Sequence, residues 1–211
     1  MPKPPNLSFD EAAAVPLAAM TALQGLRDHG GIESGHNVLV NGASGGVGTF
    51  GVQIAKALGA DVTAVCSTRN IELAQSLGAD HVIDYTREDF TRIDRRFDLV
   101  LDVAGSRSWS ELTRVLAPRA TVVVAGAPKG NDVVGPLSHI VGTRLASLRG
   151  SQKAVNFVAK FDRPGLELLR ELLEGGKIQP VVERRYELME TSDALRYMGE
   201  GHARGKLVIT M

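Results

Sequence analysis

The chain has little of what several protein classes require. Cys66 is the one cysteine in 211 residues, which excludes an intrachain disulfide framework and a cysteine-based zinc site. Lys plus Arg (24) balance Asp plus Glu (24), so no net field attracts nucleic acid or an anionic membrane surface. No run reaches the about 18 apolar residues of a membrane span, and residues 1–6 hold no apolar core of signal-peptide length. We therefore expect no nucleic-acid or membrane partner, and a cytoplasmic location.

Patterns for catalysis by side chains are also missing. The histidines lie at 29, 36, 81, 139 and 202, without the spacing of metal ligands, so no metal site is expected. There is no Gly-x-Ser-x-Gly elbow, and no tyrosine is followed four residues later by the lysine of a Tyr/Lys acid–base pair. Lys206 opens a strand and is interpreted as a solvated edge residue. No catalytic residue is assigned.

What is present is an alternation of strand and helix patterns. Short apolar runs at 38–40, 62–66, 81–84, 97–103 and 121–125 predict strands, and the segments that follow the first, second and fourth runs predict helices, at 47–58, up to 77 and up to 116. Strands that are apolar on both faces belong to a parallel sheet covered on both sides. We predict an α/β fold, a doubly wound parallel Rossmann sheet with helices on both faces.

The flanking segments have a different character. Ser8 and Glu11 form a capping box that starts a helix, and Pro16 separates it from a second helix at 17–29. Beyond residue 126 we expect a helix at 137–148, a strand at 154–158 and a helix at 164–175; strands at 186–188 and 206–209 with a helix at 192–199 form a small C-terminal module. The predicted organisation is a helical lead-in (1–34), a Rossmann domain (35–180) and a C-terminal segment (181–211).

A glycine-rich segment, residues 41–48, joins the first strand to its helix. Gly42 suits the turn off the strand, Gly45 and Gly46 let a pyrophosphate approach the backbone, and Gly48 lets helix and sheet pack closely. The free amides of the helix N-terminus attract phosphate. A second GxGxxG register, at Gly46, Gly48 and Gly51, is rejected because its third glycine falls inside the helix. The alternative is that the glycines only permit a tight turn.

The end of the second strand indicates which nucleotide binds. NAD sites place a carboxylate about 20 residues after the glycines, but this chain has Ser67, Thr68, Arg69 and Asn70 there. Hydroxyls and a guanidinium suit the 2′-phosphate of NADP. The alternative is that Ser67 or Thr68 caps the next helix while Arg69 is solvated. We expect NADP(H) as cofactor.

Four motifs together resemble a known family. The glycine loop at 42–48, the segments 57–60 and 76–85, and the closing Gly-His-Ala-Arg-Gly-Lys at 201–206 are similar to the zinc-independent quinone oxidoreductase and zeta-crystallin branch of the medium-chain dehydrogenase/reductases. The resemblance implies NADPH-dependent hydride transfer to quinones or α,β-unsaturated carbonyls. It also implies that Tyr85 lies by the 2′-phosphate and that Asn70 replaces a phosphate-binding lysine, with Arg69 as a substitute.

The resemblance adds residues that line the nicotinamide and its ribose, in three pairs at 104–105, 126–127 and 157–158. With the glycine loop and the end of the second strand, the expected cofactor site consists of Ser44, Gly45, Gly46, Val47, Ser67, Thr68, Arg69, Asn70, Tyr85, Ala104, Gly105, Gly126, Ala127, Phe157 and Val158.

Family members also have a front half, a GroES-like domain that shapes the substrate pocket, and this chain begins at about the junction. We therefore expect the chain to be inactive alone. Two alternatives stay open: an NADP-binding or sensing module that acts with a partner chain, and a separately expressed piece without its own role. Exposed apolar residues of the C-terminal module, Leu188, Leu195 and Tyr197, are then a partner surface. Relatives imply a homodimer through a sheet edge.

Overall fold

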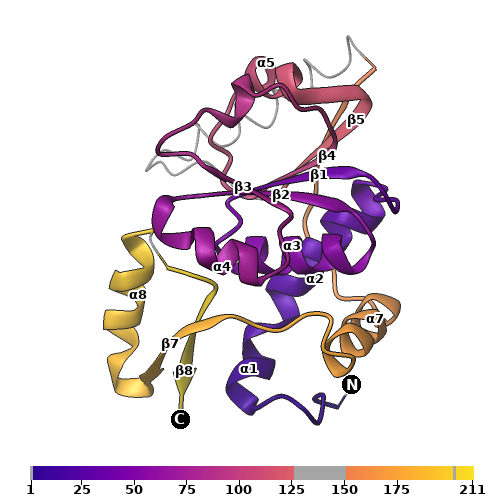
Figure 1. Ribbon diagram of the computed structural model, residues 1–211. Helices are drawn as coiled ribbons and strands as arrows, with labels where there is room; N and C mark the ends of the chain where they lie inside the picture. Colours follow the sequence, from indigo (N-terminus) through magenta and orange to yellow (C-terminus); the bar gives the residue numbers. More distant parts are fainter. Residues whose placement is uncertain (1, 126–150, 202) are drawn as a thin grey trace.

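Within residues 2–125, 151–201 and 203–211, which the computed structural model describes, six parallel strands form one sheet (Figure 1). Their order is β3-β2-β1-β4-β5-β6, and this is the strand order of a doubly wound dinucleotide-binding fold. The strands are β1 (Asn37–Asn41), β2 (Asp61–Cys66), β3 (His81–Asp84), β4 (Phe97–Asp102), β5 (Leu116–Val124) and β6 (Lys153–Asn156). The predicted fold class is confirmed.

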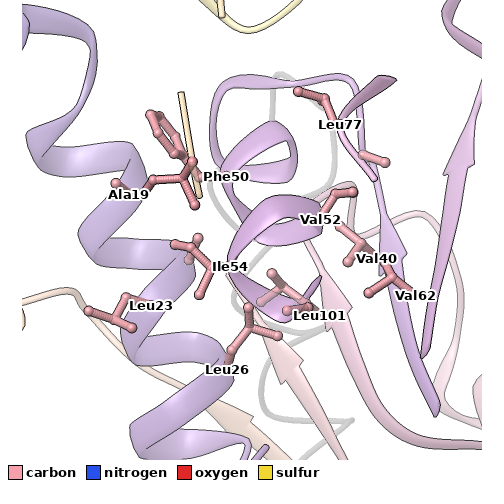
Figure 2. Close-up of a cluster of buried hydrophobic side chains, with 14 of the residues drawn as sticks. Ala19, Leu23, Leu26, Val40, Phe50, Val52, Ile54, Val62, Leu77 and Leu101 are labelled. Atoms are coloured by element: carbon pink, nitrogen blue, oxygen red, sulfur yellow. The ribbon is translucent and has the colours of Figure 1, made fainter. Parts of the chain in front are cut away.

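One face of the sheet is covered by helices from both ends of the chain. These are α2 (Pro16–Gln24), which continues as a π-helix at Gly25–His29, α3 (Gly46–Ala57), α4 (Ile71–Ser76) and α7 (Arg163–Glu174). Figure 2 shows the packing of α2 and α3 side chains, such as Leu23 and Ile54, toward Val40 and Leu101 of the sheet. Because α2 and its π-helical continuation belong to this core, residues 16–29 of the predicted lead-in pack with the Rossmann domain; the predicted domain limits themselves stay predictions.

The other face carries smaller elements. Short 3₁₀ turns at Phe90–Arg92 and Thr113–Val115 and the helix α5 (Trp109–Leu112) lie there, on the opposite side of the sheet from α3 in Figure 1. Leu39 points to this face while its neighbours Val38 and Val40 point to the other, as the period of two in a strand requires. Helices on both faces therefore follow from strands that are apolar on both sides.

A separate pair of parallel strands lies near the C-terminus. These are β7 (Val182–Glu187) and β8 (Lys206–Thr210), joined through the 3₁₀ turn Leu188–Glu190 and the helix α8 (Thr191–Gly199). The module lies beside α1 (Phe9–Ala14) in Figure 1, and Arg185 forms an ion pair with Asp10 of α1 at 2.6 Å. The predicted strand-helix-strand module is confirmed, with a first strand that begins four residues before the expected start at 186.

Three local predictions need correction. Leu116 was expected to end a helix, but it begins β5 and pairs with Phe97, because strand pairing outweighs the helical pattern of the preceding residues. Pro16 marks the break between two helices, as predicted, but α2 begins at Pro16 itself, one residue before the expected start, where proline is favoured. Tyr197 is half-buried, because its hydroxyl donates to Glu183 (3.0 Å) and Arg184 stacks on its ring. The expected helix at 137–148 lies outside the described residues.

Candidate functional site

The candidate site lies at the carboxyl edge of the six-stranded sheet. The strand order reverses between β1 and β4, whose residues Asn41 and Asp102 are paired in register. In open α/β sheets, loops diverge at such a switch point and leave a crevice where ligands bind. The glycine loop and the loop at 103–106 follow these two strands, so two segments that the sequence assigned to the cofactor lie together at the switch point.

The glycine loop has the geometry that the sequence predicted. Gly42 has a φ of 85°, in the left-handed region that glycine adopts at little cost. A β-carbon on Gly48 would lie 2.1 Å from the carbonyl oxygen of Gly42, so only glycine lets α3 begin this close to β1. Gly51 lies inside α3, which agrees with the rejection of the second GxGxxG register.

The start of α3 is available to an anion. Its N-cap residue, Gly45, has an extended backbone and no side-chain cap hydrogen bond. The first-turn amides of Gly46 and Val47 have no carbonyl partner within the helix, and the helix dipole adds partial positive charge there. The local structure fits a pyrophosphate.

The C-terminal module lies directly against this loop. The amide of Gly205 donates to the carbonyl of Ser44 at 2.8 Å, and Gly45 and Gly205 form an isolated parallel bridge. A β-carbon on Gly46 would lie 2.6 Å from Cδ and 3.5 Å from Nζ of Lys206. Lys206 opens β8, an edge strand as expected, but it is half-buried because part of its side chain lies over Gly46. Sequence reasoning missed it because the contact spans 160 positions and no local pattern signals it.

At the end of β2, Asn70 connects two candidate residues. Asn70 is buried, and its Nδ2 donates to Ser44 Oγ (3.0 Å) and to Ser67 Oγ (3.1 Å). Ser67 makes no side-chain cap hydrogen bond, which removes the capping alternative for this residue. The side-chain amide of Asn70 therefore connects the end of β2 to the glycine loop.

Thr68 has a different partner. Its hydroxyl donates to Asp84, and Asp84 also accepts from the hydroxyl (2.7 Å) and amide (3.0 Å) of Thr86. The hydrogen bond from Thr68, followed by those from Thr86, holds the pKa of Asp84 below its ordinary value. The one hydroxyl proton of Thr68 is thus engaged by a carboxylate that the sequence did not identify as part of this region.

Two further residues of the expected cofactor site lie at the same carboxyl edge of the sheet. Arg69 and Tyr85 are exposed, and the Tyr85 amide donates to the Cys66 carbonyl at 3.0 Å. The charge of Arg69 acts to lower the pKa of Tyr197, against the larger effect of the hydrogen bond to Glu183 that raises it. Arg69 therefore lies in electrostatic range of the C-terminal module.

Beyond β4, Ala104 contacts the glycine loop: a β-carbon on Gly42 would lie 3.2 Å from the Ala104 amide nitrogen. The Gly105 amide donates to Asp102 Oδ1 at 2.9 Å. Phe157 packs against His29, with ring centroids 4.4 Å apart, and Val158 is exposed. Gly126 and Ala127 lie outside the described residues.

The cysteine is a poor nucleophile in this fold. Cys66 is buried, and burial, with a smaller contribution from the charge of Asp84, raises the pKa of its thiol to about 11. The thiolate is the reactive form of cysteine, so Cys66 packs as a small apolar residue.

Two features are absent from the described parts of the chain. No group of three or more His, Cys, Asp or Glu residues there could hold a metal ion. Among the same residues, no helix is long and apolar enough to span a membrane.

Comparison with known proteins identifies the family. The family model described as zinc-binding dehydrogenase matches residues 77–209. This chain belongs to that family. It is a quinone-oxidoreductase-type member of the medium-chain dehydrogenase/reductase superfamily, as its motifs indicated.

Individual relatives support the same family assignment. The chain is 36% identical over 229 residues to the mouse mitochondrial NAD(P)H oxidoreductase RTN4IP1, covering 99% of this chain and 57% of the relative. It is 31% identical to a chloroplastic quinone-oxidoreductase of Triphysaria versicolor, over 98% of this chain and 64% of that one. The solved quinone oxidoreductase of Coxiella burnetii superposes with a TM-score of 0.86 at 29% identity, over 100% of this chain and 63% of that chain. The chain thus spans about three fifths of the length of these relatives.

Proposed function

We propose that this chain is the NADP(H)-binding part of an oxidoreductase that transfers hydride to quinones or α,β-unsaturated carbonyls. The relatives named above, an NAD(P)H oxidoreductase and two quinone oxidoreductases, support this assignment. The observation that carries it is the uncapped start of α3 with Lys206 lying over Gly46. First-turn amides that have no partner within α3 lie there with the Lys206 ammonium group close by, and a dinucleotide pyrophosphate would satisfy both.

The residues present fit this cofactor. Gly46, Val47 and Lys206 would hold the pyrophosphate, and Ser67 and Arg69 would lie toward the adenosine ribose. Asn70 Oδ1 is buried without a hydrogen-bond partner among the described residues, an unsatisfied acceptor of the kind that a ligand or water completes. When bound, the nicotinamide supplies the hydride, and the protein supplies binding and orientation.

Discrimination for NADP over NAD is assigned to the end of β2. An NAD site uses a carboxylate that accepts from the ribose hydroxyls. The nearby carboxylate is Asp84, and both of its oxygens already accept from Thr68 or Thr86. Arg69 is then the charged group at this position, and a guanidinium favours the 2′-phosphate. Since Thr68 donates to Asp84, the hydroxyl donor left for the phosphate is Ser67.

Calorimetry with the purified chain tests this proposal. NADPH should bind more tightly than NADH, and R69A should weaken NADPH binding about tenfold while NADH binding changes little, because one charge-assisted contact is lost. R163A is the matched control, since Arg163 lies at the start of α7 and pairs with Glu167. NADH binding as tight as NADPH binding would contradict the role of Arg69.

We further propose that the 211-residue chain has little or no quinone reductase activity without a supplied substrate domain. The relatives are longer, and the resemblance implies that their front part shapes the substrate pocket. Appreciable oxidation of NADPH by a quinone with the pure chain would contradict this. The second candidate is an NADP-binding module that acts with a partner chain; NADPH affinity with turnover appearing only in a heteromeric complex would favour it.

Oligomeric state and location are proposals as well. A homodimer would form through a sheet edge, and β6 is the last strand of the described sheet at the β5 side; a light-scattering mass tests it. Zinc independence and a cytoplasmic location remain predictions. The names of the relatives place them in mitochondria or chloroplasts, so fluorescence of the tagged chain in its native cell is the direct test of location.

A further inference from the structure

A buried polar pair lies at the switch point of the sheet, where β1 and β4 end. Asn41 and Asp102 end the neighbouring strands β1 and β4 and are partners in register. Their exposed fractions are 3% and 0%. A buried carboxylate costs desolvation free energy, and replacing such pairs with apolar residues is often neutral or stabilising. Stability alone is therefore a weak reason for this pair.

The pair forms hydrogen bonds that reach the next loop. Asn41 Nδ2 donates to Asp102 Oδ1 (2.8 Å) and to Ser106 Oγ (3.2 Å), and the Gly105 amide donates to the same Asp102 oxygen (2.9 Å). Hydrogen bonds to an ionised acceptor are about twice as strong as neutral ones. One carboxylate oxygen thus connects the end of β1 with the loop that follows β4.

These bonds restrict the position of Ala104 and Gly105. Gly105 has a φ of 60°, and its amide is held by Asp102. On the other side, Ala104 packs against Gly42 of the glycine loop. The loop at 103–106 is therefore held between the glycine loop and the buried pair, and small movements of the pair would displace it.

We propose that Asn41 and Asp102 are positioning residues for the nicotinamide half of the cofactor. They act through the loop at 103–106, which they hold in contact with the glycine loop. They do not touch the cofactor themselves. This inference rests on the proposed function. It predicts that damage to the pair weakens binding of the nicotinamide half and leaves the adenosine half unaffected.

Calorimetry with two probes tests the inference on the whole 211-residue chain. NADPH occupies both halves of the site, whereas adenosine 2′,5′-bisphosphate occupies the adenosine half alone. N41A should weaken NADPH binding about fivefold, the effect of one hydrogen bond of ordinary strength, and change binding of the bisphosphate less than about twofold. S106A, which removes only the longer contact, should have a smaller effect in the same direction.

N70A is the matched control, because Asn70 is also a buried asparagine but ties Ser44 to Ser67 at the adenosine end. It should weaken both probes. Circular dichroism and melting temperature show whether each variant is folded, and N41S, with a shorter but polar side chain, replaces N41A if N41A does not fold.

The outcomes separate the inference from the proposed function. Selective loss of NADPH binding in N41A supports the inference. Equal losses for both probes mean that the pair is only structural, and no loss for either means that it does not position the loop; both results overturn the inference. If the wild-type chain binds neither probe, the proposed function fails, and the inference fails with it.

Discussion

Lys206, the first residue of β8, lies over Gly46, the first residue of α3: a β-carbon on Gly46 would be 2.6 Å from Lys206 Cδ. The contact joins the C-terminal module to the glycine loop. The neighbouring Gly205 amide donates to the Ser44 carbonyl, so backbone pairing holds the lysine close to the loop.

Removing this charge should weaken cofactor binding. We expect K206M to raise the dissociation constant of NADPH about tenfold, because a charge-assisted contact to phosphate is worth about 1.5–3 kcal/mol. The difference from wild type should shrink as salt is raised. Calorimetry at two ionic strengths measures both effects. K153M is the matched control, since Lys153 is exposed at the start of β6, and an equal loss in K153M would contradict a local role for Lys206.

Gly48 should be required for folding. In G48A the new β-carbon would meet backbone atoms of Gly42 and Ala43 at 2.1–2.8 Å, which cannot move without shifting α3 from the sheet. We expect a loss of about 3 kcal/mol in the free energy of unfolding, the upper end of overpacking costs. Urea denaturation measures it.

G199A is the control for Gly48. Gly199 is the last residue of α8 and has open space around its Cα, so this variant should unfold within about 0.5 kcal/mol of wild type. A G48A protein as stable as G199A would show that the close approach of α3 to β1 is not required.

The Asp84 carboxylate should make stability depend on acid pH. Its pKa is lowered in the folded state, chiefly by the hydrogen bond from Thr68. A lowered folded pKa stabilises the protein fully above the unfolded value, near 3.9, and this contribution is lost as pH falls below it. D84N should therefore be less stable than wild type at pH 7. The difference in stability between the two proteins should narrow as pH falls from about 5 toward 3.

Thermal melts of both proteins across this range provide the measurement. T68V removes the main donor to Asp84 and should reproduce part of the D84N behaviour. T113V removes a hydroxyl bonded to a backbone carbonyl, and its difference in stability from wild type should not change with pH. A gap between D84N and wild type that is constant with pH would show that Asp84 does not carry this dependence.

Most of the fold was predictable because residue patterns that are local in the sequence indicate its strands and helices. Short apolar runs at β1 and β2, each followed by a helical pattern, led to the right sheet class, and the glycines between Asn41 and Gly48 led to the glycine turn that precedes α3. Boundaries were less accurate where pairing decides them. Leu116 joins β5 because Phe97 is its partner, and no local pattern near Leu116 indicates that pairing.

The structure brings several of the expected site residues together, but the sequence did not predict the hydrogen bonds among them. Ser44, Ser67 and Asn70 were expected near the cofactor, but their mutual hydrogen bonds follow from the parallel neighbours β1 and β2. Thr68 was expected as a phosphate donor, and its engagement by Asp84 depends on the register of β2 with β3.

The sequence by itself determined the strand–helix alternation, the glycine turn at Gly42 and the absence of an acid at the end of β2, since each depends on residues close together in the chain. The tertiary structure alone decided that Lys206 lies over Gly46 and that Asn41 meets Asp102. Those contacts join segments far apart in sequence, and their geometry is set by strand order and register, which the parallel sheet establishes only when the whole chain is folded.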